Sequence, residues 1–408
     1  MENYKQIRVV LSTLGPLHLI KSAEYLSKLV DINVVQGWIP KWWNKWLLSI
    51  ASKIQHRDIY KTIKKRTPDC LYGRNHSVAL PDIIFWARVL FKLGSRQKAS
   101  ANAALMYGKM SQKYIKDADI YHVRSGSGGN GAIETARSRG MKVIVDHSIA
   151  HPAFMDMQLR PEYEKNGESF ELGMSNPFWQ GIVEECKKSD VLLVNSDFVK
   201  KTFIDNGFSE EKIKVVYLGV RKDFVGLKKD WSLKNGTLRI LFTGGFGIRK
   251  GAEYILRALC ALDKINVQYE MTVVGANDSG NLLLQYFPEH IKFVNTIPQD
   301  ELKAYLANTD VYLFPSLCEG CASSGMEALA AGLPVIATVE SGLPIVNGEN
   351  GVIVENKNVD AIVNAIMTLK DNCQIRKHLG SNAMQDISTK YTWDRYAEEV
   401  VKIYKSVL

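Results

Sequence analysis

Two glutamates in the second half of the chain carry the clearest chemical signal. Glu319 and Glu327 lie in residues 315–328, Pro-Ser-Leu-Cys-Glu-Gly-Cys-Ala-Ser-Ser-Gly-Met-Glu-Ala, and seven residues separate them. Residues 310–314 read as a short buried strand that ends just before Glu319, and residues 324–331 read as the next helix, with Glu327 in its first turn. Open α/β sheets bind ligands at that edge, and N–H groups at a helix amino terminus attract phosphates. The pattern predicts an anion-binding site.

Both glutamates also have a purely structural interpretation. Ser324-Gly-Met-Glu327 has the spacing of a capping box, in which the two side chains satisfy N–H groups of the first helical turn. Glu319 fits no such motif, but a loop can carry an exposed carboxylate without a function. The spacing alone leaves both interpretations open.

A basic pair follows the first predicted strand of the second half. The stretch Gly244-Gly-Phe-Gly-Ile-Arg249-Lys250-Gly251 opens the helix after that strand. Cations at a helix amino terminus oppose the macrodipole, at a cost of roughly 0.3–1 kcal/mol each. A bound anion reverses that cost, so the placement favours a phosphate site over a pair that is merely solvated.

A glycine-rich turn supports a different class of protein. Gly126-Ser-Gly128-Gly-Asn-Gly131 follows a predicted strand, precedes a predicted helix, and is followed by Asp146 twenty residues after its first glycine. This is the spacing of a dinucleotide fingerprint, typical of an oxidoreductase. Such fingerprints usually open the first unit of a domain, whereas this one lies in the middle, so we prefer to read it as the lining of a cleft.

Two other motifs resemble metal or redox sites. His147 and His151 have the spacing of two ligands on a helix, but no acidic partner lies within the motif, and a structural histidine is the alternative. Cys318 and Cys321 form a lone C-x-x-C without the second pair that a zinc site needs. We expect no metal site.

Strand and helix patterns alternate along both halves of the chain, which predicts parallel, doubly wound sheets. A polar stretch at residues 221–237 reads as an interdomain linker, so we expect two Rossmann-like domains, at residues 1–220 and 221–392, with a ligand between them. The strands are expected at 7–11, 32–35, 120–123, 142–145, 191–194 and 214–217, then at 238–243, 268–274, 291–294, 311–314, 335–337 and 351–354.

The composition is that of a soluble globular protein. Of the 408 residues, 46% are hydrophobic and 23% charged, and no apolar run is long enough for a spanning helix. Six cysteines in so long a chain fit a reducing compartment. We therefore expect a cytoplasmic protein, peripheral on the inner face of the cytoplasmic membrane.

That membrane expectation comes from one segment. Residues 41–66 contain six lysines, two arginines and one aspartate, out of a net charge of +9 for the chain. A helix there would place Trp43 and Trp46 on one face, close to Trp42, as in a basic amphipathic helix on an anionic membrane. The alternatives are a core-packing helix with a solvated basic face and a nucleic-acid surface. No recognition fold supports the latter.

The motif P-S-x-x-E-G-…-E-A-x-A-x-G-x-P-V-I-A-T resembles the signature of the family 4 retaining glycosyltransferases. Lys250-Gly251 matches the end of that family's loop G-R-L-x-x-x-K-G, but the family arginine position is Gly245 here, and Arg249 lies beside the lysine instead. The resemblance implies a GT-B fold, in which the last helix, at 393–408, crosses back to the first domain.

The resemblance also implies roles for individual residues. Glu319 would hold hydroxyls of the donor sugar, Glu327 the ribose diol, Lys250 and Arg249 the diphosphate, and His147 would approach the donor sugar. The remaining donor-binding candidates are Gly320, Cys321, Ala322, Ser323, Gly244, Gly245 and Gly15, and the acceptor or membrane side comprises Trp42, Trp43, Trp46 and Arg160.

The implied reaction moves a hexose, with retention, from a nucleotide-diphosphate donor to a saccharide acceptor. The acceptor is expected to be linked to a polyprenyl diphosphate, as in surface polysaccharide biosynthesis, and neither metal nor cofactor is expected. The alternatives are the dinucleotide-dependent oxidoreductase and a non-enzymatic membrane-surface adaptor.

Overall fold

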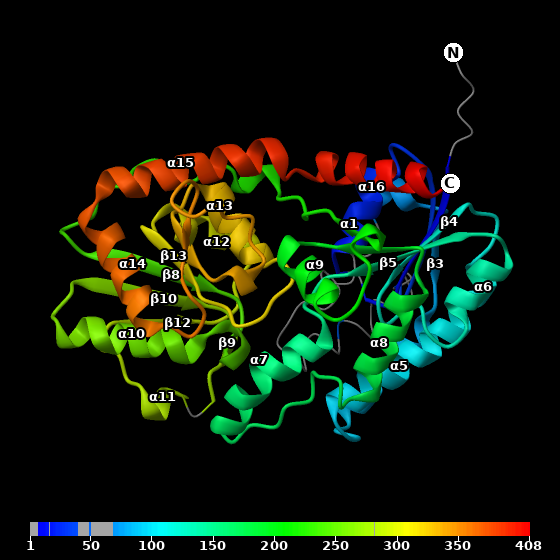
Figure 1. Ribbon diagram of the computed structural model, residues 1–408, viewed down its shortest axis with the longest axis horizontal. Coiled ribbons are helices and arrows are strands. Elements are labelled where there is room, and N and C mark those ends of the chain that lie inside the picture. The colour runs from blue at the N-terminus through cyan, green and yellow to red at the C-terminus, as the bar shows by residue number, and fades with distance from the viewer. Residues whose placement is uncertain (1–6, 16, 40–48, 50–67, 281) are drawn as a thin grey trace, which may run out of the picture.

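The computed structural model describes residues 7–15, 17–39, 49, 68–280 and 282–408. The predicted membrane residues Trp42, Trp43 and Trp46 lie outside these ranges, so their role stays a prediction. The described chain forms two α/β lobes, which lie side by side in Figure 1.

The first lobe contains a seven-stranded parallel sheet with the strand order β3-β2-β1-β4-β5-β6-β7. Its central strands are largely apolar because helices cover both faces of the sheet, as in β1, where five of six residues are buried. The strands are β1 (Arg8–Thr13), β2 (Asp31–Gln36), β3 (Asn75–Ser77), β4 (Ile120–Arg124), β5 (Lys142–His147), β6 (Val191–Val194) and β7 (Ile213–Val215). The helices are α1 (Leu17–Leu26), α4 (Ala79–Leu90), α5 (Arg96–Ser111), α6 (Ala132–Ser138), α7 (Pro152–Lys165), α8 (Pro177–Lys188) and α9 (Asp197–Ile204).

The second lobe contains a six-stranded parallel sheet with the order β12-β10-β8-β13-β14-β15, and the short pair β11-β9. The strands are β8 (Leu238–Thr243), β9 (Phe246–Gly247), β10 (Tyr269–Val274), β11 (Asn277–Asp278), β12 (Ile291–Val294), β13 (Val311–Phe314), β14 (Val335–Ala337) and β15 (Val352–Ile353). The helices are α10 (Ala252–Lys264), α11 (Leu282–Gln285), α12 (Gln299–Ala307), α13 (Ser323–Ala331), α14 (Val359–Asp371), α15 (Cys373–Lys390) and α16 (Trp393–Val407). The predicted pair of doubly wound domains is confirmed.

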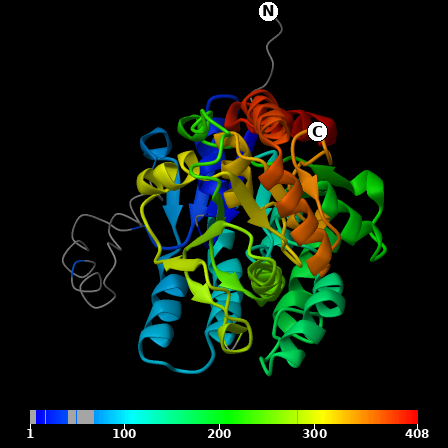
Figure 2. The same cartoon turned by 90° about the vertical axis from the view of Figure 1, so that its left-hand side faces the viewer.

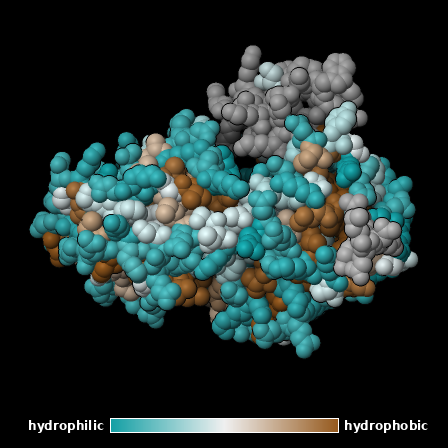
Figure 3. Space-filling view, turned by 90° about the horizontal axis from the view of Figure 1, so that it is seen from above, coloured by the Kyte–Doolittle hydropathy of each residue, from teal (hydrophilic) through white to brown (hydrophobic). Residues whose placement is uncertain are grey.

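The last helix, α16, belongs to the second half of the chain but packs on the first lobe (Figure 1). Its buried residues recur at helical spacing and join the core formed by α1 and β1. Trp393 stacks on Tyr25, and the Tyr404 hydroxyl lies 2.6 Å from His122 Nδ1. The face that α15 and α16 cover is mostly hydrophilic on its outer surface (Figure 3).

The lobes also touch through α7, which lies against the second lobe. The Tyr254 hydroxyl donates a hydrogen bond to Glu162 Oε2 over 2.9 Å, and Lys357 Nζ lies 2.9 Å from Glu162 Oε1. Lys165 Nζ lies 2.5 Å from Glu253 Oε1. These contacts fix the spacing of the two sheet edges that face each other.

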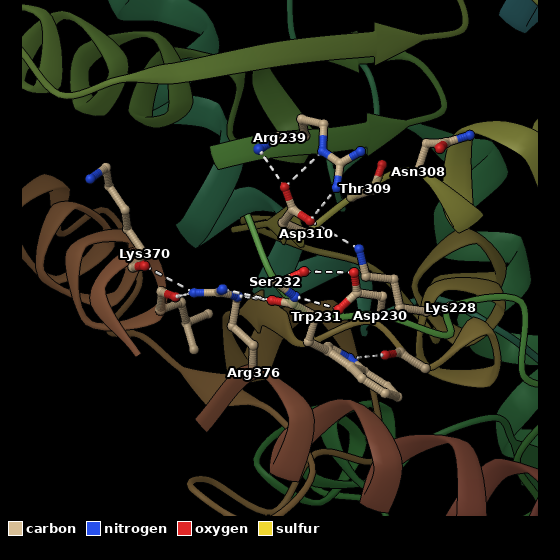
Figure 4. Close-up of polar contacts among 12 residues, drawn as sticks. Lys228, Asp230, Trp231, Ser232, Arg239, Asn308, Thr309, Asp310, Lys370 and Arg376 are labelled. Atoms are coloured by element: carbon tan, nitrogen blue, oxygen red, sulfur yellow. Dashed lines mark hydrogen bonds and ion pairs between the residues drawn. The ribbon is translucent and has the colours of Figure 1, made fainter. Parts of the chain in front are cut away.

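Part of the predicted linker at 221–237 is built into the second lobe. The Lys228 side chain is only 2% exposed, and its Nζ lies 2.9 Å from Asp310 Oδ1. Arg239 Nη2 lies 2.7 Å from the same oxygen (Figure 4). The Arg376 guanidinium donates hydrogen bonds to the Trp231 carbonyl oxygen. The stretch lies between the last strand of the first sheet and the first strand of the second, and these contacts anchor Lys228 and Trp231 in the second lobe.

Candidate active site

The predicted basic pair and the first glutamate meet at the carboxyl edge of the second sheet. Arg249 Nη1 lies 2.6 Å from Glu319 Oε1, and Lys250 Nζ lies 3.5 Å from the same oxygen. Arg249 also donates to the Cys318 carbonyl oxygen, and Lys250 Nζ lies 5.1 Å from the centroid of the Phe314 ring, at the end of β13. Two cations therefore surround one carboxylate.

A glycine makes this arrangement possible. Arg249 and Lys250 lie in a 3₁₀ turn (Ile248–Lys250), and α10 begins just after them, at Ala252. Gly251 joins the two with φ of 76°, and a Cβ there would lie 2.1 Å from the Pro315 carbonyl oxygen. Only glycine fits both the dihedral angle and the close approach.

Burial and charge set the protonation of the pair. Burial lowers the pKa of Lys250, and the neighbouring Arg249 guanidinium lowers it further, while the Glu319 carboxylate opposes both effects. For Arg249 burial also acts to lower the pKa, but the charge of Glu319 prevails and raises it. The guanidinium therefore stays charged.

A cavity of about 560 Å³ opens beside the two cations, between the lobes. The first lobe contributes its wall at the end of α7, and the second contributes the turn before α10 and the β9–β11 pair. Its lining residues are Tyr163, Asn166, Glu168, Gly245, Gly247, Ile248, Arg249, Lys250, Asp278, Ser279 and Leu282.

Of the two adjacent glycines that were predicted to bind the donor, Gly245 lines this cavity and Gly244 directly precedes it. A Cβ at Gly244, where φ is 118°, would lie 3.0 Å from Lys250 Nζ. A Cβ at Gly245 would lie 2.6 Å from Asp278 Oδ2, so Asp278 takes up space beside the position of the family arginine. Sequence reasoning missed Asp278, since no motif marks it.

Glu327 faces a second interdomain cavity, of about 260 Å³. Burial raises the pKa of Glu327 to about 7, against the opposing effect of the Arg221 guanidinium. The cavity also contains predicted donor-side residues Cys321 and Ser323. Its lining residues are His18, Lys21, Leu218, Gly219, Val220, Arg221, Gln299, Cys321, Ser323, Met326, Glu327 and Trp393.

The capping-box interpretation of Glu327 was wrong. α13 begins at Ser323, one residue earlier than predicted, and its N-cap residue is Ala322, which has no side-chain capping hydrogen bond. Ser324 therefore lies inside the helix and cannot cap it. The Glu327 carboxylate instead accepts a hydrogen bond from Gln299 Nε2, over 3.5 Å.

The backbone N–H groups of the predicted donor-binding residues 320–323 are only partly available to a ligand. The Ala322 N–H donates to the Ser341 carbonyl oxygen over 3.3 Å. Gly320 lies against the first lobe, where its carbonyl oxygen accepts a hydrogen bond from the Ser196 hydroxyl and a Cβ would lie 2.0 Å from the Ser148 carbonyl oxygen. This loop is therefore also a contact between the lobes.

His147 is placed at the carboxyl end of β5 but is only 1% exposed. Its Nδ1 lies 2.9 Å from the Ser125 hydroxyl, and burial lowers the pKa of His147 to about 3, so the ring is neutral. His151 caps α7 by accepting from the Ala153 N–H. Among the described residues, no group of three or more His, Cys, Asp or Glu side chains could hold a metal ion.

The glycine-rich turn after β4 is already occupied by a carboxylate. Glu185 Oε2 accepts hydrogen bonds from the N–H groups of Gly126, over 2.8 Å, and Gly128, over 3.1 Å. Asp146, the predicted ribose ligand of an oxidoreductase, is 4% exposed and lies within 3.2 Å of both His18 and Arg124. This geometry gives the dinucleotide alternative no support.

Two further residues that were predicted for the site, Gly15 on the donor side and Arg160 on the acceptor side, lie on the first lobe. Gly15 follows β1, and its carbonyl oxygen accepts from the Thr13 hydroxyl. Arg160, on α7, pairs with Asp156, and its guanidinium lies 5.0 Å from the centroid of the Phe170 ring. Phe170 in turn lines a third cavity, of about 730 Å³, between α5 and α8.

Two parallel Rossmann-like domains with cavities between them define the GT-B fold, and comparisons with known proteins agree. Over 98% of its length the chain superposes on sucrose-phosphate synthase of Thermosynechococcus elongatus, with a TM-score of 0.69 at 15% identity and 99% of that chain covered. HepE of Anabaena, solved in complex with UDP, gives a TM-score of 0.62 at 16% identity, covering 98% of this chain and 100% of that one.

Residues 226–386 match the family model described as Glycosyl transferases group 1. The second domain is therefore similar to the group 1 glycosyl transferases. An uncharacterized glycosyltransferase of Methanocaldococcus jannaschii, MJ1607, is 29% identical over 48% of this chain and 54% of its own. The amylovoran biosynthesis glycosyltransferase AmsK of Erwinia amylovora is 31% identical over 40% of this chain and 44% of its own. The chain spans about half the length of the curated relatives it matches.

Proposed function

We propose that the protein transfers a hexose from a nucleotide-diphosphate donor to a saccharide acceptor, with retention of configuration. The observation that carries the proposal is the cluster of Arg249 and Lys250 around Glu319, beside an interdomain cavity of about 560 Å³. The departing diphosphate gathers negative charge, and fixed cations in a partly buried site stabilise such charge strongly. This is also the task that a divalent metal would otherwise perform, so the proposed reaction needs none.

The two glutamates take separate parts of the donor in this proposal. Glu319 accepts hydrogen bonds from the sugar hydroxyls once the diphosphate has drawn Arg249 and Lys250 towards itself. Glu327 binds the ribose diol in the neighbouring cavity, and the leaving phosphate takes the proton of the acceptor hydroxyl. HepE is solved with UDP and with UDP-glucose, which supports a nucleotide-sugar donor for this chain.

The acceptor is proposed to be a lipid-linked saccharide in surface polysaccharide biosynthesis. AmsK acts in amylovoran biosynthesis, and a structural neighbour is the lipopolysaccharide outer core galactosyltransferase WaaB. The first lobe offers the cavity between α5 and α8, next to Phe170 and Arg160, for the acceptor. We further propose that the protein is cytoplasmic and peripheral on an anionic membrane. None of the helices in the described part of the chain has the length and apolar character needed to cross one.

Glu319→Gln tests the proposal, with Glu349→Gln at an exposed site as the matched control. A panel of labelled UDP- and GDP-sugars is first screened with the unaltered protein and membrane extract as acceptor. We expect Glu319→Gln to lower kcat by about 10²-fold with a small change in donor KM, since its interactions strengthen in the transition state. Full turnover in Glu319→Gln would refute the role, and a thermal shift with NAD in place of UDP or GDP would favour the oxidoreductase.

A further inference from the structure

The helical hairpin formed by α4 and α5 carries an apolar surface that the rest of the described chain leaves open to solvent. Positions 80, 83, 86 and 90 fall on one face of α4 by helical spacing, and two more apolar residues lie in the turn that joins α4 to α5. Six large side chains, each between 39% and 69% exposed, make up this hairpin surface: Leu80, Ile83, Trp86, Leu90, Phe91 and Leu93. Singly exposed apolar residues are normal, but a contiguous row of this size marks an interaction site.

The hairpin itself packs against the first lobe through buried side chains and hydrogen bonds. The opposite face of α5 is buried through small residues and Tyr107, whose hydroxyl donates to the Val35 carbonyl oxygen over 2.7 Å and lies 3.0 Å from the Ser12 hydroxyl. At the start of α4, Asp82 Oδ2 accepts from the Trp38 N–H over 2.7 Å. In Figure 2 the light-blue pair of helices projects at the lower left, with its turn at the edge of the molecule. The packed parts of α4 and α5 therefore fix the apolar turn at the surface of the molecule.

The exposed charges that the hairpin itself contributes between residues 79 and 98 have one sign. Residues 79–98 contain four basic side chains, and their single acidic residue is the buried Asp82. The basic residues, all at or near the turn, are Arg88, Lys92, Arg96 and Lys98. Apolar side chains flanked by cations are the composition of a surface that lies in the interface of an anionic bilayer.

We infer that the hairpin surface docks the protein on an anionic phospholipid membrane. Phe91 and Leu93 enter the boundary between headgroups and acyl chains, the row on α4 lies along it, and the four cations pair with lipid phosphates. Each such cation raises membrane partitioning roughly fivefold. A second copy of this chain is a poorer occupant, because the same four cations would then face each other.

Docking in this way brings the acceptor cavity to the membrane. Ser95 and Lys98, at the turn of the hairpin, also line the cavity between α5 and α8. A lipid-linked saccharide could enter there without leaving the bilayer surface. The inference rests on the proposed function only in that both place the protein on a membrane. Vesicle binding is measured without donor or acceptor, so its result is independent of the transferase activity.

The test is flotation of the full chain with vesicles of phosphatidylcholine alone or with 30% phosphatidylglycerol. We expect binding to the anionic vesicles only, weakened by salt because screening reduces surface attraction. Replacing Leu90, Phe91 and Leu93 together by Ser, or Lys92, Arg96 and Lys98 together by Gln, should weaken binding at least tenfold. The matched control is Ile265→Ser with Phe287→Ser, two exposed apolar residues of the second lobe, which should bind as the unaltered protein does.

Thermal unfolding of each variant checks that it is folded. Binding by the apolar variant at unaltered strength would overturn the inference, as would absence of vesicle binding by the unaltered protein. Loss of binding only in Trp42/Trp43/Trp46→Ser would assign docking to the other segment and also overturn it. Sedimentation that shows a dimer, abolished by the apolar variant, would assign the surface to self-association.

Discussion

Glu327 offers a sharp quantitative test of the site, because partial burial in the interdomain cavity outweighs the nearby Arg221 guanidinium and raises the pKa of its carboxyl group. Burial raises the pKa of Glu327 to about 7, from an ordinary value of 4.5. Below pH 4.5 the group is protonated in both the folded and the unfolded protein. As the pH rises towards 7 the unfolded chain releases the proton more readily, so stability is progressively lost.

The size of the effect follows from the interval between the two pKa values. One pKa unit corresponds to 1.36 kcal/mol, so the interval from 4.5 to about 7 corresponds to about 3 kcal/mol above pH 7. Glu327→Gln removes the titration while keeping the shape of the side chain. The variant should match the unaltered protein near pH 4.5 and exceed it by about 3 kcal/mol at pH 8.

Chemical denaturation at several pH values between 4.5 and 8.5, without nucleotide, measures this difference. Glu349→Gln, at an exposed site, serves as the control and should follow the unaltered protein at every pH. If the stability curves of Glu327→Gln and the unaltered protein run parallel, the burial argument is refuted. If the ionised carboxylate binds the ribose diol, UDP or GDP should stabilise the unaltered protein more at pH 8 than at pH 6. The same nucleotide should stabilise Glu327→Gln equally at both pH values.

Two further predictions concern the charge clusters of the second lobe. Arg249→Met should lower kcat about 10²-fold, because it removes one of the two cations at the leaving group. Arg249→Lys should recover part of the lost rate, because it restores a positive charge. Equal rates for the two variants in a donor-saturated assay would contradict the role of Arg249. Asp310→Asn should destabilise the fold by about 3–5 kcal/mol, because it leaves the buried ammonium of Lys228 without its counter-charge. Denaturation midpoints measure this, and a loss below about 1 kcal/mol would show that the cluster reorganises.

The sequence pattern predicted the two sheets well, since buried parallel strands are short apolar runs and their helices repeat at 3.6 residues. It also located Glu319 beyond β13, because that position depends only on neighbouring residues. Glu327 was predicted in the first turn of α13 but is its fifth residue and lies beyond that turn. The capping box failed by two residues, since the N-cap of α13 is Ala322 and not Ser324, and no local rule separates the two positions.

Partners that are distant in the chain could not be read from the sequence. No pattern links Arg249 to Glu319, or Glu185 to the turn at Gly126, because each pair meets only where separate elements pack together. The same holds for the apolar row on α4, whose spacing also fits a buried helix; exposure alone distinguishes the two. Local order and the chemistry available are thus determined by the sequence of each segment. Which charges meet, and which surface stays open, is decided by tertiary packing, since both depend on distances that the backbone sets only after folding.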